Sequence, residues 1–293
     1  MIKITETFRN LSTKGKILII AIISVILILP VIIVICIICL KKPTITEPMR
    51  VTEFEDISFT VEEYPGPYDP DNFENSGEYK YYYDDEGNLK SMMGIDVSYA
   101  QKNIDWPRVK AAGIDFAIIR VGYRGYESGD IHQDEYFEKN ITEAVDAGVK
   151  VGVYFFSQAL TPEEAKEEAE FTLEHIQDYN ITFPVVFDWE TIGTSPARTD
   201  NISSEALNRS ALEFCRVVED AGYKPMIYSS LNLLREQFHK YDDRITEYDL
   251  WLAEYKNHPE YPKDFVMWQY TSEGHVDGIQ KLVDLDMFFG TEE

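Results

Sequence analysis

The stretch KVGVYFFSQALTPEEAKEEAEFTLEHIQDYNITFPVVFDWE, residues 150–190, contains two short apolar runs separated by one long helical pattern. The runs at 150–157 and 183–190 are rich in valine and phenylalanine, which favour strands. Between the runs, Thr161 is a suitable N-cap, and Pro162 suits the first position of a helix. The stretch therefore predicts a strand–helix–strand unit, which is the building block of α/β folds.

The same alternation continues on both sides of this stretch. Six further apolar runs predict strands, and they cover residues 92–98, 116–122, 224–230, 249–255, 265–270 and 282–288. Eight strands that alternate with connections over about 200 residues predict an irregular (β/α) TIM-like barrel. A doubly wound open sheet is the alternative. Because the connection between Trp251 and Trp268 is short and rich in proline, we expect no full helix there.

An uncharged apolar run lies near the N-terminus, at residues 17–40. As a helix it would be about 36 Å long, slightly more than the hydrocarbon core of a membrane. Because Lys41 and Lys42 follow directly, with no small residues at a cleavage point, an uncleaved transmembrane anchor is favoured over a cleaved signal peptide. The positive residues before the run favour a cytoplasmic tail at 1–16.

The remaining sequence predicts an extracellular stalk at 41–90 and a barrel domain at 91–293. The stalk is inferred from a segment rich in proline and acidic residues without periodicity. The turn signal DDEGN at 84–88 predicts that it ends in a hairpin. We therefore expect a single-pass cell-membrane protein, attached through residues 17–40, with a monomeric extracellular domain.

The charge and the cysteines exclude several functions. The net charge of −25 argues against nucleic acid as a partner. Of the three cysteines, only Cys215 lies in the domain outside the apolar run, so that domain has no internal disulfide. The five histidines form no metal-binding spacing, and there is neither a phosphate-binding loop nor a G-x-S-x-G elbow. We expect no metal and no cofactor.

Acidic residues interrupt the apolar runs at the positions where a barrel places catalytic groups. Asp188 and Glu190 end the run at 183–190, Asp96 lies in GIDVS, and Asp284 and Asp286 lie in VDLDMF. Side chains two apart on a strand point to one face, with Cα atoms about 6.5–7 Å apart. Two carboxyl groups at such spacing tend not to ionise together, so one becomes a proton donor beside an anion, as glycosidic cleavage requires.

Aromatic and polar side chains near the predicted strand ends suit a sugar ligand. Aromatic faces pack against the C–H faces of sugar rings, and polar groups bond the hydroxyls, although filling of the barrel explains any single aromatic residue equally well. The candidates are Tyr123, Tyr154, Tyr228, Trp251, Trp268 and Tyr270, with Arg120 and Gln269 beside them.

Residues 94–290 resemble glycoside hydrolase family 25, the lysozymes related to Chalaropsis-type muramidases. The matching segments include GIDVSYAQKNIDWPRVKAAGIDFAIIRVGY, FPVVFDWE, YKPMIYSS and MWQYTSEGHVDGIQKLVDLDMF. The resemblance implies hydrolysis of the β-1,4 bond between N-acetylmuramic acid and N-acetylglucosamine in peptidoglycan glycan strands. It implies that Glu190 is the general acid, Asp188 the neighbouring charged carboxylate, and Asp96 and Asp284 the first and last acids of the pocket. Tyr154, Tyr228 and Gln269 fall where the family lines its sugar cleft.

The sequence departs from the family pattern at two places. The segment RVGYRGYES stands where many members have a K-x-[ST]-E-G-like sequence, and Asp286 stands where the family often has asparagine. Two alternatives to a muramidase stay open. One is a catalytically weak glycan-binding or scaffold protein on the same barrel, and the other is a chitinase-like hydrolase. Retention and inversion of configuration are both compatible with these acids.

Overall fold

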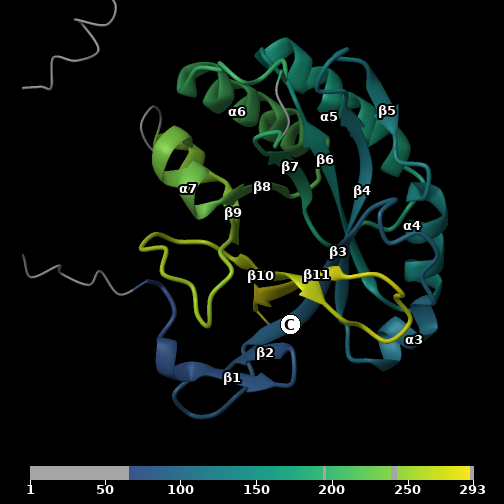
Figure 1. The fold of residues 1–293 in the computed structure, drawn as a ribbon, viewed down its shortest axis with the longest axis vertical. Coiled ribbons are helices and arrows are strands. Elements are labelled where there is room, and N and C mark those ends of the chain that lie inside the picture. Colours follow the sequence, from purple (N-terminus) through teal and green to yellow (C-terminus); the bar gives the residue numbers. More distant parts are fainter. Residues whose placement is uncertain (1–65, 194–195, 239–242, 291–293) are drawn as a thin grey trace, which may run out of the picture. The chain divides into compact units, whose positions relative to one another are not determined.

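The computed structural model describes residues 66–193, 196–238 and 243–290 (Figure 1). The predicted cytoplasmic tail, the anchor at 17–40 and the first part of the stalk lie outside these residues. Within the described ranges, no helix has the length and apolar character that crossing a membrane requires.

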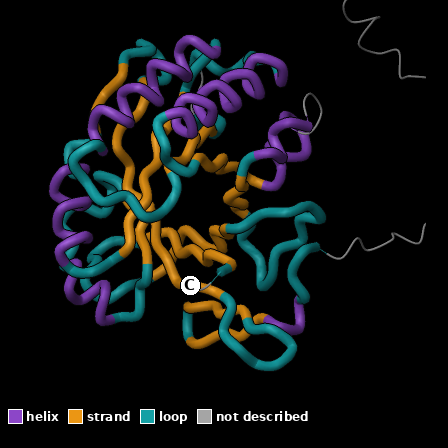
Figure 2. Tube along the Cα trace, turned by 180° about the vertical axis from the view of Figure 1, so that it is seen from behind, coloured by secondary structure: helices purple, strands orange, loops and turns teal. Residues whose placement is uncertain are grey.

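Eight strands close into a barrel, as the sequence predicts (Figure 2). Neighbouring strands run parallel except β11, which is antiparallel to both β10 and β3. The pairing of β3 with β4 closes the ring. The barrel strands are β3 (Ser91–Val97), β4 (Phe116–Arg124), β6 (Lys150–Ser157), β7 (Val185–Trp189), β8 (Pro225–Ser230), β9 (Asp249–Ala253), β10 (Met267–Gly274) and β11 (Val283–Phe289). The closed ring excludes the open-sheet alternative.

Helices cover the barrel along β3 to β8, and the expected gap lies between β9 and β10, where residues 254–266 form no helix (Figure 1). Thr161 and Ser203 cap α5 and α6 by accepting hydrogen bonds from Glu164 N and Ala206 N. The helices are α3 (Trp106–Ala111), α4 (Phe137–Asp146), α5 (Pro162–Ile176), α6 (Ser204–Asp220) and α7 (Leu231–Leu233). Shorter 3₁₀ or π turns are η1 (Pro70–Asn72), η2 (Leu234–Phe238) and η3 (Asp243–Glu247).

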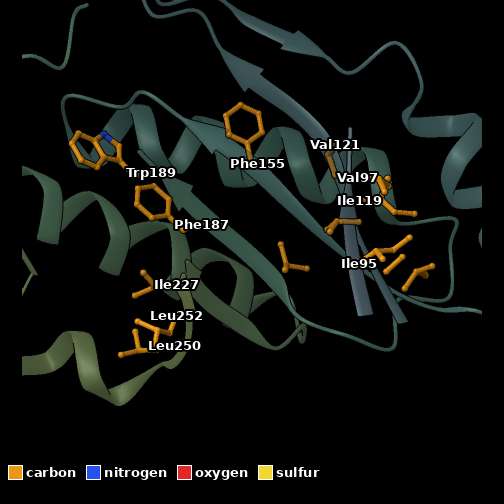
Figure 3. Close-up of a cluster of buried hydrophobic side chains, with 14 of the residues drawn as sticks. Ile95, Val97, Ile119, Val121, Phe155, Phe187, Trp189, Ile227, Leu250 and Leu252 are labelled. Atoms are coloured by element: carbon orange, nitrogen blue, oxygen red, sulfur yellow. The ribbon is translucent and has the colours of Figure 1, made fainter. Parts of the chain in front are cut away.

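Each barrel strand separates two apolar clusters. Its outward residues join the cluster beneath the helices, where Phe187 packs on Phe214 with ring centroids 5.4 Å apart (Figure 3). Its inward residues, such as Val186, fill the barrel. Because side chains alternate along a strand, Asp188 points inward like Val186, whereas Trp189 points outward with Phe187.

Residues 66–90 pack on the barrel rather than extending from it as a free stalk. Strands β1 (Phe73–Ser76) and β2 (Tyr79–Tyr82) form a hairpin whose turn contains Gly77, with a φ of 66°. The DDEGN turn follows this hairpin, and Tyr83 and Leu89 pair antiparallel across it, as the turn signal predicts, before the chain enters β3. The Tyr68 ring stacks on Phe289 at 3.5 Å, and its hydroxyl donates to the Phe265 carbonyl oxygen at 2.7 Å. Composition suggested a free stalk, because it cannot show contacts with residues that are distant in sequence. The short strand β5 (Ile131–Gln133), paired with β4, was also not predicted.

Candidate active site

A cavity of about 250 Å³ lies at the end of the barrel to which the parallel strands point. Every barrel strand contributes a side chain to its lining. The contributors are Asp96 (β3), Arg120 (β4), Tyr154 and Phe156 (β6), Asp188 with the following Glu190 (β7), Tyr228 (β8), Trp251 with the following Tyr255 (β9), Gln269 (β10) and Asp284 (β11). The cavity is therefore where the predicted acids meet.

The four predicted acids share this cavity but differ in exposure. Asp188 and Asp96 are buried, at 4% and 8% exposure, whereas Glu190 and Asp284 are only half-buried. Asp284 lies near the start of β11, directly opposite Asp96 in the β11–β3 register. Because β11 runs antiparallel, the start of this strand meets the carboxyl ends of the others, and Asp284 reaches the same cavity.

Burial raises the pKa of each of these carboxyl groups, and repulsion from a neighbouring acid adds to the rise at Asp96, Asp188 and Glu190. Burial first, then the charge of Asp284, raises the pKa of Glu190. Burial and then Glu190 raise the pKa of Asp188, which Arg120 opposes. Burial raises the pKa of Asp284 to about 6. A cluster of this kind retains protons near neutral pH, so it holds a proton donor next to anions.

A buried amide holds the backbone at Glu190. Gln158 follows β6 and is fully buried, and its Nε2 donates to the carbonyl oxygen of Glu190 at 3.2 Å. Its Oε1 accepts a hydrogen bond of 2.6 Å from the hydroxyl of Thr199. Because Gln158 ties the end of β7 to the loop that follows, it fixes where the Glu190 side chain enters the cavity.

Gln269 links the acids to the aromatic lining. Its Nε2 donates to Asp96 Oδ2 at 2.7 Å. Its Oε1 accepts from the hydroxyls of Tyr228 and Tyr255, at 3.0 and 2.9 Å. The donated bond favours the charged form of Asp96, although burial and then Asp284 and Asp286 still raise the pKa of Asp96 well above its usual value. Gln269 thus fixes the orientation of Asp96.

Three predicted sugar-binding residues lie outside this cavity. Tyr270 is buried on the outer face of β10 and lines a different hollow. Trp268 is fully buried on the outer face of β10, and its Nε1 donates to the carbonyl oxygen of Glu254 at 2.7 Å. Tyr123 lines a neighbouring hollow of about 530 Å³ that shares Arg120 and Phe156 with the cavity. Tyr154, Tyr228, Gln269 and Trp251 line the cavity itself. Trp268 therefore stabilises the fold, while Tyr123 extends the site.

Tyr255 and Phe156 line the cavity but were not among the predicted residues. Tyr255 follows β9 and is 56% exposed, although its hydroxyl bonds Gln269. It is the last residue of the predicted strand at 249–255, a position that the aromatic criterion would have accepted. Phe156 lies in an apolar run, where nothing in the sequence distinguishes it from a core residue.

Comparison with known proteins identifies the barrel. The model of glycosyl hydrolases family 25 matches residues 95–279, which include most of the barrel and three of the four clustered acids. The chain belongs to this family. It is therefore a glycoside hydrolase.

Several family relatives cover most of the barrel. The uncharacterized protein YegX of Escherichia coli O157:H7 is 30% identical over 204 residues, or 68% of this chain and 70% of YegX. The autolytic lysozyme of Clostridium acetobutylicum is 27% identical over 67% of this chain and 56% of its own length. The crystal structure of a bacterial lysozyme from Streptomyces coelicolor is 25% identical, with a TM-score of 0.58 over 68% of this chain and 93% of that one.

Asp286 is a further buried acid of this glycoside hydrolase. It is fully buried beneath the cavity, and its Oδ1 accepts from Trp251 Nε1 at 3.0 Å. Its Oδ2 is buried and has no hydrogen-bond partner, and the carboxyl group of Asp96 lies close enough to influence it. Two buried carboxyl groups in such proximity do not readily ionise together. Burial, followed by the charge of Asp284, accordingly raises the pKa of Asp286 well above its usual value.

We expect Asp286→Asn to stabilise the enzyme increasingly as the pH rises. A carboxyl group whose pKa is raised on folding holds its proton longer in the folded state, so it costs stability above its unfolded pKa of about 3.9. Asparagine keeps an acceptor for Trp251 and does not ionise. Melting temperatures of the two proteins, measured from pH 5 to 8, should therefore diverge with increasing pH. A constant difference across this range would contradict the raised pKa.

Proposed function

We propose that the protein is a muramidase that cleaves the β-1,4 bond between N-acetylmuramic acid and N-acetylglucosamine in peptidoglycan. The observation that carries the proposal is the set of four clustered carboxyl groups in the cavity of a family 25 barrel. The lysozymes among its relatives support the choice of a bacterial wall glycan over chitin. The cavity is lined by Tyr154, Tyr228 and Tyr255, whose rings suit contact with the sugars of a glycan strand.

The acids then divide the work according to their surroundings. Glu190 is half-buried, reaches the cavity and has a raised pKa, so it is the proton donor to the leaving oxygen. Asp188 is deeper and lies within the influence of Arg120, which favours its charged form. In that form it stabilises positive charge that develops at the sugar ring. Asp96 and Asp284 line the cavity around the same sugar ring and contribute to its electrostatic field.

We also propose that residues 17–40 anchor the enzyme in the cell membrane as a single span. The proposal rests on the uncharged apolar run and on the basic residues before it. The catalytic domain, as a monomer, would then work outside the cell next to the wall. Membrane fractions washed with carbonate should retain the full chain, whereas a chain that lacks residues 1–40 should be washed out.

The test of the muramidase proposal is the identity of the sugar at each new chain end. Purified peptidoglycan is digested with the full-length protein and reduced with borohydride, and the products are analysed by mass spectrometry. A muramidase leaves reduced muramic acid at the new ends. Reduced glucosamine would show that the other glycosidic bond is cut, and the proposal would be wrong. If no new ends appear although the protein binds the wall, the glycan-binding alternative holds.

A further inference from the structure

A second hollow, of about 720 Å³, adjoins the catalytic cavity through Tyr255, which lines both. One wall is the β1–β2 hairpin, which contributes Glu78 and Lys80. The other walls are the loop at 255–260 and the end of β10. The hairpin precedes the family match, which begins at residue 95. The wall formed by the hairpin therefore lies outside the segment that the family model matches, while the other walls lie inside it.

Lys80 is a cation without an anionic partner in this hollow. Its Nζ donates to Asn75 Oδ1 at 3.0 Å and to the Asn257 carbonyl oxygen at 3.1 Å, both neutral acceptors. It lies 5.8 Å from the ring centres of both Trp268 and Tyr270. Within the part of the chain that the structure describes, no carboxylate lies within ion-pair distance of Lys80 Nζ.

Three of the other charged residues that line this hollow, Glu78, Lys256 and Glu260, are in ion pairs, and Glu273 adds one more carboxylate to its wall. Lys256 binds Glu254 at 3.3 Å and also binds Glu260. Glu78 binds His275 at 3.0 Å. Partial burial lowers the pKa of Lys80, which is the expected effect when no nearby carboxylate compensates. A carboxylate placed in the hollow would supply the missing counter-charge.

The opposite side of the catalytic cavity has a different chemistry. There, Tyr99 and Tyr123 line the neighbouring hollow, and Tyr99 is 50% exposed. The guanidinium of Arg120 lies 4.9 Å from the Tyr99 ring and is already neutralised by Asp134 at 2.7 Å. Exposed aromatic faces beside a neutralised cation suit sugar rings. A hollow with charged walls and an unpaired ammonium suits a charged peptide instead.

We propose that the hollow at Lys80 binds the peptide carried by the muramic acid residue of the substrate, with the ammonium of Lys80 receiving a peptide carboxylate. The proposal rests on the muramidase function and deepens it. Wall peptides carry free carboxylates, and the sugar that bears them would occupy the cavity next to Tyr255. A charge-assisted hydrogen bond is roughly twice as strong as a neutral one, so the contact favours peptide-bearing strands by about tenfold.

The experiment compares glycan strands with and without their peptides, the latter prepared with an amidase. The full-length enzyme should show a KM about tenfold lower for peptide-bearing strands, and added salt should reduce this preference. Lys80→Met should abolish the preference by raising KM on peptide-bearing strands alone, with kcat unchanged. Lys80→Arg should retain much of it. Lys166→Met, which removes an exposed lysine on α5, is the matched control and should retain all of it.

The outcomes separate the two proposals. If the wild type cleaves neither substrate, the muramidase function is wrong, and the peptide site is wrong with it. If it cleaves both with equal KM at low salt, only the peptide site is wrong. A Lys80→Met variant that keeps the preference, or that loses the same factor on both substrates, also overturns the peptide site. The wild-type comparison decides the matter even if Lys80→Met fails to fold.

Discussion

Glu190→Gln should lower kcat on peptidoglycan by about a hundred- to ten-thousand-fold, the usual contribution of a general acid. Glutamine has nearly the same shape and can still accept hydrogen bonds from a sugar, so KM should change little. The amide cannot protonate the leaving oxygen, however. The loss should therefore appear in the chemical step, measured as the rate at which new reducing ends form at saturating substrate.

The pH profile gives an independent check on Glu190. A general acid must be protonated, so wild-type activity should fall as the pH rises through the raised pKa of Glu190. The residual activity of Glu190→Gln should lack this alkaline limb. Glu219→Gln, an exposed change on α6, serves as the control and should match the wild type in both rate and profile. If Glu190→Gln kept the wild-type rate, the proton donor would have to be another acid of the cavity.

The sequence predicted the barrel strands because their signal is local. Each of the eight is a short run with residues buried on both faces, which composition alone reveals. The acids were found for the same reason, since a carboxyl group inside a buried run needs a partner or a chemical role. Their meeting in one cavity followed from the rule that strand ends gather at one face of a barrel.

Two of the aromatic residues that lie outside the cavity show what the local signal lacks. Trp268 and Gln269 are neighbours on β10, so alternation allows only one of them to face the cavity, and Gln269 does. Tyr123 follows a register shift between Arg120 and Gly122 in the pairing of β4 with β6. Such a shift changes the direction in which the side chains after it point. The alternation of side chains along a strand could have corrected the prediction for Trp268. The position of Tyr123 becomes clear only from the strand pairing.

The packing of the hairpin on the barrel could not be predicted from its composition. Residues 66–90 are polar and acidic enough to suggest a stalk, although six of these 25 residues are aromatic, four of them within 79–83. Tyr68 and Phe73 are held by Phe289 and Trp268, which lie about 200 residues further along the chain. The wall that carries Lys80 therefore appears only once the whole chain has folded.

A buried ion pair behind the site should dominate the stability of this side of the barrel. Arg124 ends β4 and donates to Glu168 Oε1 at 2.7 Å, and both side chains are buried. Its other nitrogens donate to the carbonyl oxygens of Gly129 and Glu164, each at 2.8 Å. Glu168 also accepts from the hydroxyl of Ser157 at 2.6 Å, directly before Gln158. The network therefore fixes the end of β6 from which Gln158 reaches Glu190.

Arg124→Met should lower the free energy of unfolding by about 3–5 kcal/mol at pH 8, the cost of leaving a buried charge unpaired. Burial already raises the pKa of Glu168 to about 7, and Arg124 opposes that rise. Without Arg124 the pKa of Glu168 in the folded protein rises further. The folded state then binds a proton that the unfolded state has lost, so the free energy of unfolding falls as the pH increases. At pH 5 Glu168 is protonated in both proteins, and the difference should shrink. Urea unfolding at the two pH values measures it.

Two further variants separate the pairing from simple loss of an arginine. Arg216→Met removes an exposed arginine that pairs with Glu213 and Asp220 on α6, and it should have little effect at either pH. Arg124→Met combined with Glu168→Leu removes both charges and should recover much of the loss, because an apolar pair leaves no charge buried. If the double variant were as unstable as Arg124→Met at pH 8, the loss would come from the two carbonyl contacts of Arg124 instead. The pH dependence would then be absent as well, since neither carbonyl oxygen titrates.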